Sequence, residues 1–108
     1  MEQAFGFVRQ VDHPAVTLNF DVGAIHMAGA FSRVADYLAT MMPVVSHVHV
    51  SQPQLAPAPA DPAEARVLLT ALAAHAYPHW VSIEMRAVAG QEVEAVAAAL
   101  GRLQEARA

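Results

Sequence analysis

Three short strand-forming segments, separated by helix-forming ones, most constrain the fold of this chain. The strand-forming segments cover residues 15–21, 44–50 and 80–85. Helical spacing occupies residues 2–10, 31–41, 61–75 and 91–106. Strands joined through a helix are normally parallel, because the helix returns the chain to the same end of the sheet. The pattern predicts an α/β fold over 1–108 as a single domain with three parallel strands.

Two connecting segments carry specific local signals. The segment 22–30, "VGAIHMAGA", is expected to be a loop with glycines as hinges. Asp61, Pro62 and Glu64 form a strong helix start, with a capping residue, a proline at the first helical position and an acid three residues after the cap. The helix that follows is expected to run to about His75.

Each predicted strand has one apolar face and one polar face. Val16, Leu18 and Phe20 share the apolar face of the first strand, for example. The polar faces carry Thr17, Asn19, Asp21, His47, His49, Ser51, Ser82 and Glu84. Burial of so many polar groups without partners costs several kcal/mol. The polar faces are therefore expected to line a surface that is wet, charged or bound to a ligand.

The strongest polar groups stand at the carboxyl ends of the predicted strands. Asp21, His49 and Glu84 each precede a loop, and ligands of parallel α/β folds bind at that edge of the sheet. Two carboxylates and an imidazole suit Mn²⁺, Mg²⁺, Co²⁺ or Zn²⁺. Taken singly, Asp21 is equally a helix cap or a loop acid, His49 a hydrogen-bonded core histidine and Glu84 an ion-pair partner.

Composition excludes several classes of function. The net charge is −4 and the six basic residues are all arginine, so a nucleic-acid footprint and a polybasic membrane patch are absent. The absence of cysteine excludes disulfides and thiolate metal sites. No apolar run reaches the roughly 18 residues of a membrane span, and charged residues interrupt the N-terminus where a signal peptide would be apolar. We expect a soluble cytoplasmic protein.

Three motifs in order resemble the C-terminal part of the sugar phosphate isomerase/epimerase family, the xylose-isomerase-like TIM barrels. The motifs are "LNFDVGAIHMAG", "VSHVHVSQPQLAP" and "HWVSIEMRAV", which resemble strands six, seven and eight of that family. The resemblance implies a partial (β/α)8 barrel, about the last three parallel strands with their flanking helices. A complete barrel of this kind has eight strands and about 250 residues.

The resemblance also implies roles for individual residues. Asp21, His49 and Glu84 would be three metal ligands, and Glu84 would be one of the two glutamates that act as acid and base. The family's fourth ligand is a glutamate on strand five, and this chain is expected to begin after that strand.

Other positions depart from the family or are assigned only by their location. Ala24 stands where many members have a histidine, so His26 is a candidate substrate contact from the loop, with a solvent-exposed histidine as the alternative. Arg86 is a candidate for binding a substrate oxygen or pairing with Asp21, with a surface ion pair as the alternative. Asn19 is expected to hydrogen-bond beside the metal and contribute to substrate binding.

These assignments imply a metal-dependent sugar isomerase or epimerase that transfers a proton through an enediolate. The expected partner is a small sugar, with no nucleic acid or membrane. Activity is expected to need a complementing N-terminal barrel fragment, and a homo-oligomer is a further expectation. The alternative is a non-catalytic barrel remnant or assembly module that associates by its open strand edges. Endonuclease-like hydrolysis is disfavoured by the scarcity of basic residues.

Overall fold

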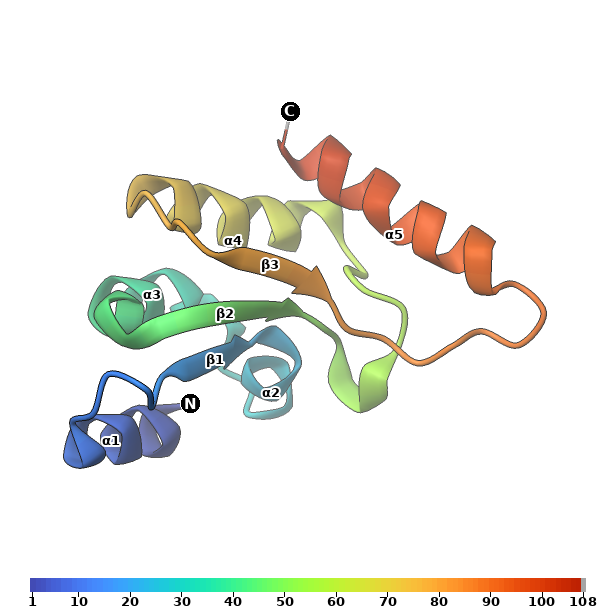
Figure 1. The fold of residues 1–108 in the computed structure, drawn as a ribbon. Helices are drawn as coiled ribbons and strands as arrows, with labels where there is room; N and C mark the ends of the chain where they lie inside the picture. Colours follow the sequence, from blue (N-terminus) through green and yellow to red (C-terminus); the bar gives the residue numbers. More distant parts are fainter. Residues whose placement is uncertain (108) are drawn as a thin grey trace.

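The computed structural model describes residues 1–107 (Figure 1). Its elements in chain order are α1 (Glu2–Val11), β1 (Leu18–Asp21), α2 (Val22–Met27), α3 (Val34–Met41), β2 (Val45–Val50), α4 (Pro62–Ala74), β3 (Trp80–Ile83) and α5 (Glu92–Arg107). Short 3-10 turns cover Phe31–Arg33, Met42–Val44 and Pro53–Leu55.

The three strands form one parallel sheet in the order β1-β2-β3, which confirms the predicted α/β class. Helices α3 and α4 lie on the same side of this sheet (Figure 1). Phe20, Val48 and Val50 from the strands are buried against Leu38 of α3 and Leu68 of α4. Apolar strand positions therefore face the helices, and the polar positions face away from them.

Strand β2 contains an irregularity that the regular alternation did not predict. Leu18 pairs with Val45, but the next residue, Asn19, pairs with His47, so β2 has one extra residue at Ser46. Such a bulge lets two successive residues face the same side. As a result Val45 and Val48 are both buried although they are three positions apart.

The segment after β1 is helical, so the predicted loop over 22–30 is wrong in its first part. Helix α2 begins directly after Asp21, whose side chain accepts a hydrogen bond from the Ala24 backbone N–H at 2.9 Å. This capping bond satisfies a donor that a helix start leaves free. The glycine at position 23, which favoured a loop, is instead a buried helical residue in close contact with Ser51.

The start of α4 follows the sequence prediction. The Asp61 carboxylate accepts a hydrogen bond from the Ala63 backbone N–H at 2.8 Å, and Pro62 occupies the first helical position. The helix ends at Ala74, one residue before the predicted end. Helix α5 then packs along α4, with Ala99 buried (Figure 1).

Both outer strands of the described sheet have an unpaired edge. β1 and β3 each pair only with β2. Trp80, the first residue of β3, is 79% exposed. Three parallel strands with helices on one face are compatible with part of a barrel. No helix within residues 1–107 is long and apolar enough to cross a membrane.

Candidate metal centre

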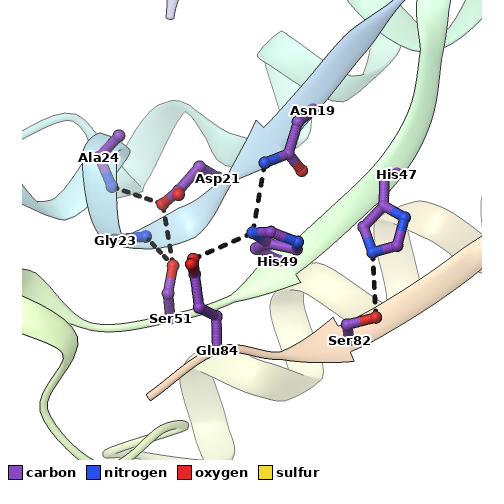
Figure 2. Close-up of polar contacts among 9 residues, drawn as sticks. All are labelled: Asn19, Asp21, Gly23, Ala24, His47, His49, Ser51, Ser82 and Glu84. Atoms are coloured by element: carbon purple, nitrogen blue, oxygen red, sulfur yellow. Dashed lines mark hydrogen bonds and ion pairs between the residues drawn. The ribbon is translucent and has the colours of Figure 1, made fainter. Parts of the chain in front are cut away.

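Asp21, His49 and Glu84 lie together at the carboxyl edge of the sheet (Figure 2). Strand register explains their proximity. Asp21 is paired with His49, His49 is paired with Ser82, and Glu84 follows two positions later, on the same face as Ser82. One ligand atom from each of the three residues lies within 4.8 Å of the others. The predicted convergence of these side chains is therefore present.

Asp21 is held by hydrogen bonds to one of its two oxygens. Its Oδ1 accepts from the Ala24 N–H and from the Ser51 hydroxyl, the latter at 2.8 Å (Figure 2). The Ser51 Oγ in turn accepts from the Gly23 N–H at 2.8 Å. Asp21 is thus a helix cap, one of the alternatives open from the sequence. The cap fixes one oxygen while Oδ2 is in none of these bonds and remains suited to bind a cation.

Ser51 connects the Asp21 cap to the end of β2. From the sequence, Ser51 was predicted only to lie on the polar face of the second strand. It is 1% exposed, so its hydroxyl is shielded from water and forms hydrogen bonds with the Asp21 carboxylate and the Gly23 N–H instead. The glycine at position 23 permits this approach, because a Cβ there would lie 2.8 Å from the Ser51 Oγ. The signal for this link in the sequence is a glycine shortly after the first strand together with a serine directly after the second.

His49 has two polar neighbours on a single ring nitrogen. Its Nδ1 lies 3.0 Å from the Glu84 Oε2 and 3.2 Å from the Asn19 Nδ2 (Figure 2). With a proton on Nδ1, the ring donates to Glu84. Nε2 lies on the far side of the ring from that carboxylate, so a cation shared by His49 and Glu84 would bind Nδ1 in place of the proton. Without that proton, Nδ1 accepts from Asn19. The expected hydrogen bond of Asn19 beside the cluster is therefore present.

The charge and spacing of the cluster fit a cation. The side chains of His49 and Glu84 are 26% and 43% exposed, so water and small molecules reach them. Among residues 1–107, no arginine forms an ion pair with Asp21 or Glu84. Two ligands on opposite sides of an ion with bonds near 2.1 Å are about 4.2 Å apart. The observed limit of 4.8 Å is slightly wider, so a bound ion would draw the side chains inward.

A second polar layer lies below the cluster on the same face. The His47 Nε2 is 2.9 Å from the Ser82 Oγ, and the His47 ring meets the His49 ring edge to face at 4.9 Å (Figure 2). Further down, Thr17 and Ser46 share a hydrogen bond of 2.6 Å. These contacts hold the histidine rings in place.

His26 lies apart from the metal cluster. Its side chain is 15% exposed, stacks on Phe31 at 4.5 Å and places Nε2 3.3 Å from the Glu64 Oε2 of α4. His26 therefore packs against Phe31 and α4, so the alternative of a solvent-exposed loop histidine is wrong, and its contact with a substrate stays a prediction.

Among residues 1–107, Arg86 forms no ion pair with the acids of the cluster. It is exposed, and its backbone N–H donates to the Leu55 carbonyl at 2.8 Å. Within the described chain it pairs neither with Asp21 nor with another acid. Its backbone instead ties the segment after β3 to the turn after β2.

No protein-family model matches this chain, and comparisons with curated proteins and with solved structures find no match.

Proposed function

We propose that Asp21, His49 and Glu84 bind one divalent cation in a centre that serves the isomerisation or epimerisation of a sugar. The observation that carries this proposal is the convergence of two carboxylates and one imidazole from three consecutive strands within 4.8 Å. Mixed oxygen and nitrogen ligation suits Mn²⁺, Mg²⁺, Co²⁺ or Zn²⁺. The three motifs that resemble sugar isomerases and epimerases support the choice of reaction.

The residues have distinct expected roles in this reaction. The cation would polarise the carbonyl and hydroxyl oxygens of a ketose or aldose. Glu84 would carry a proton to or from the adjacent carbon, because only its Oε2 is engaged with His49. Asn19 orients the His49 ring, and Ser51 orients the Asp21 carboxylate. Loss of a proton beside the carbonyl gives an enediolate, and its return on the other carbon or face completes the reaction.

Three candidate protein ligands and two open strand edges support the proposal that the centre is completed from outside these residues. We propose that further barrel strands supply a fourth ligand and a second acid-base group. A complementing fragment or a second copy of the chain would add to the same open edges. Full turnover is therefore expected only in the completed barrel, whereas cation binding and a slow partial reaction are expected of this chain.

Calorimetric titration with Mn²⁺ tests the cation site. We expect one ion per chain, and Glu84→Gln is expected to weaken binding by more than about tenfold. Glu94→Gln is the matched control, since Glu94 is an exposed acid in the first turn of α5. Equal binding by both variants would contradict the assignment of Glu84.

Exchange of a ketose's carbon-bound hydrogen with deuterated water tests the chemistry. In the presence of Mn²⁺, the chain is expected to exchange the hydrogen next to the carbonyl faster than the metal alone. Glu84→Gln is expected to remove this excess, and Glu94→Gln to keep it. Exchange that is unchanged by Glu84→Gln in a metal-loaded protein would exclude Glu84 as the acid-base group.

A non-catalytic assembly module is the second candidate. It is favoured by the unpaired edges of β1 and β3 and by the 79% exposure of Trp80 at one of them. Exposed strand edges invite pairing with another chain. Self-association without any affinity for Mn²⁺ would favour this candidate over the enzyme.

A further inference from the structure

His26, in the last turn of α2, connects that helix to α4. Its ring stacks on Phe31 with the two planes nearly parallel, and its side chain is only 15% exposed. Its Nε2 is shielded from water and forms no hydrogen bond of good geometry within residues 1–107. The Glu64 Oε2 lies 3.3 Å from this nitrogen, within ion-pair distance. The Glu64 carboxylate is therefore the group that offsets the burial of Nε2.

Glu64 stands on a firmly packed part of α4. The Asp61 carboxylate caps this helix, and Ala65 and Leu68 are buried within about one turn of Glu64. An acid three residues after a cap can reach back to the backbone N–H of the capping residue. Here its Oε2 lies beside His26 instead. The helix therefore offers His26 a carboxylate on a fixed backbone.

Helix α2 is too short to keep its orientation without such contacts. It has six residues, and isolated helices of fewer than about 12 residues are marginal in water. Its start is fixed by the Asp21 cap and by the bond from the Gly23 N–H to Ser51 (Figure 2). Its last turn is fixed by His26. Loss of the contact at one end is expected to loosen the other end, because the helix between them has little stability of its own.

The contacts at the two ends of α2 border one small cavity. His26, Ser51 and Glu64 all line it, together with apolar side chains of β2 and α4. Its volume is about 10 Å³, which is room for roughly one water molecule. Because the packing leaves so little free space, a displaced His26 ring must push on its neighbours. A change at the His26–Glu64 contact is thus transmitted to Ser51, which holds Asp21.

We infer that His26 and Glu64 are positioning residues, which fix α2 and with it the Asp21 carboxylate. The inference rests on the proposed function, because Asp21 is one of the three candidate ligands of the cation. It assigns to His26 a role through protein contacts, separate from the predicted substrate contact. Because coupling between two sites is reciprocal, a cation bound at Asp21 is expected to strengthen the His26–Glu64 contact by the same factor.

Hydrogen exchange of backbone amides, followed by NMR in the metal-free chain, tests whether this contact positions Asp21. The Ala24 N–H donates to the Asp21 Oδ1, and the Gly23 N–H donates to Ser51, so these two reporter amides follow the start of α2. The Val48 amide, in the buried centre of the sheet, reports global unfolding. A selective effect on the reporter amides therefore separates positioning from a general loss of stability.

His26→Phe keeps an aromatic ring against Phe31 and removes Nε2. The two reporter amides are expected to exchange about fivefold faster in this variant, the effect of one polar contact, while Val48 keeps its rate. His75→Phe, at the exposed end of α4, is the matched control and is expected to keep all the original rates. Unchanged exchange at both reporter amides, or an equal acceleration at Val48, would overturn the inference.

A double-mutant cycle measured by Mn²⁺ calorimetry tests the coupling to the cation site. His26→Phe and Glu64→Gln are each expected to weaken Mn²⁺ binding about threefold. The double variant is expected to lose no more than either single variant, because the same contact is absent in all three. Additive losses, or the original affinity in both single variants, would overturn the inference. Absence of Mn²⁺ binding by the original chain would reject the cation site instead, and the exchange rates would still decide whether the pair positions Asp21.

Discussion

At the scale of single residues, the candidate cation site depends on one close packing contact. Gly23 brings its backbone N–H to the Ser51 hydroxyl, which donates to Asp21. A Cβ at position 23 would lie 2.8 Å from the Ser51 Oγ and 3.0 Å from the Gln52 carbonyl oxygen. The side chain of Ser51 can move, but the Gln52 carbonyl is backbone. The position of Asp21 is thus coupled to a residue that carries no side chain.

Gly23→Ala is expected to destabilise the protein and weaken Mn²⁺ binding together. The added methyl must displace Ser51 and the backbone of Gln52, at a cost of about 1–3 kcal/mol. Gly101→Ala is the matched control, because nothing lies within 4 Å of its added Cβ and it stands inside α5. It is expected to gain about 0.5–1 kcal/mol from helix propensity. Urea unfolding measures both, and a neutral Gly23→Ala would contradict the packing account.

Ser51→Ala is expected to lower the free energy of unfolding by about 1–3 kcal/mol, since it leaves the buried Gly23 N–H without its acceptor. It also removes one of two donors to the Asp21 Oδ1, so Mn²⁺ affinity is expected to fall. Ser46→Ala, whose hydroxyl bonds Thr17 lower on the same face, is expected to leave Mn²⁺ affinity nearly unchanged. Calorimetry that finds equal affinity in Ser51→Ala and the original chain would contradict this role.

At the scale of elements, the sequence predicted the strands and long helices because each has a clear period or cap. Asp61 with Pro62 predicted the start of α4, and alternation predicted the polar face of β1. Helix α2 was missed because glycine lowers helix propensity, and the tertiary contact of Gly23 with Ser51 outweighs that preference. The bulge at Ser46 was missed because it depends on pairing between strands.

The candidate site was predictable in part for the same reason. Equivalent strand ends placed Asp21, His49 and Glu84 together, since parallel strands share a carboxyl edge. The location of His26 was not predictable, because one helical turn directs it towards Glu64 of α4 instead. The sequence therefore predicts where a strand ends more reliably than it predicts the direction in which a side chain beyond that end points.

Asp61→Ala is expected to lower the free energy of unfolding by about 1 kcal/mol, because the Ala63 N–H loses its capping acceptor. Asp61→Ser is the matched control, since serine caps a helix nearly as well as aspartate. Urea unfolding is the measurement. A loss in Asp61→Ser as large as that in Asp61→Ala would show that the cap is not the cause.

At the scale of the whole molecule, the sheet has a covered face and a polar face with two unpaired edges (Figure 1). Buried apolar residues on the helix side hold the strands, and the polar groups on the other side are free to bind. The stability of the chain and its candidate chemistry therefore use opposite faces. Completion of the open edges by further strands would enclose the polar face without disturbing the core.

Association through the β3 edge is expected to bury Trp80, the single tryptophan, which is 79% exposed in the isolated chain. Raising the protein concentration is then expected to shift its fluorescence to shorter wavelength as sedimentation reports larger species. Trp80→Arg is expected to weaken this association, because a charged residue on a strand edge opposes pairing. Concentration-dependent association that leaves the tryptophan emission unchanged would exclude this edge.

Pulsed electron paramagnetic resonance of the Mn²⁺-loaded chain tests the central claim most directly, because it detects nitrogen atoms bonded to the ion. The account predicts coupling to one imidazole nitrogen, lost in His49→Ala and retained in His26→Ala, whose ring lies against α4. Coupling that survives His49→Ala, or the absence of any bound Mn²⁺, would contradict it.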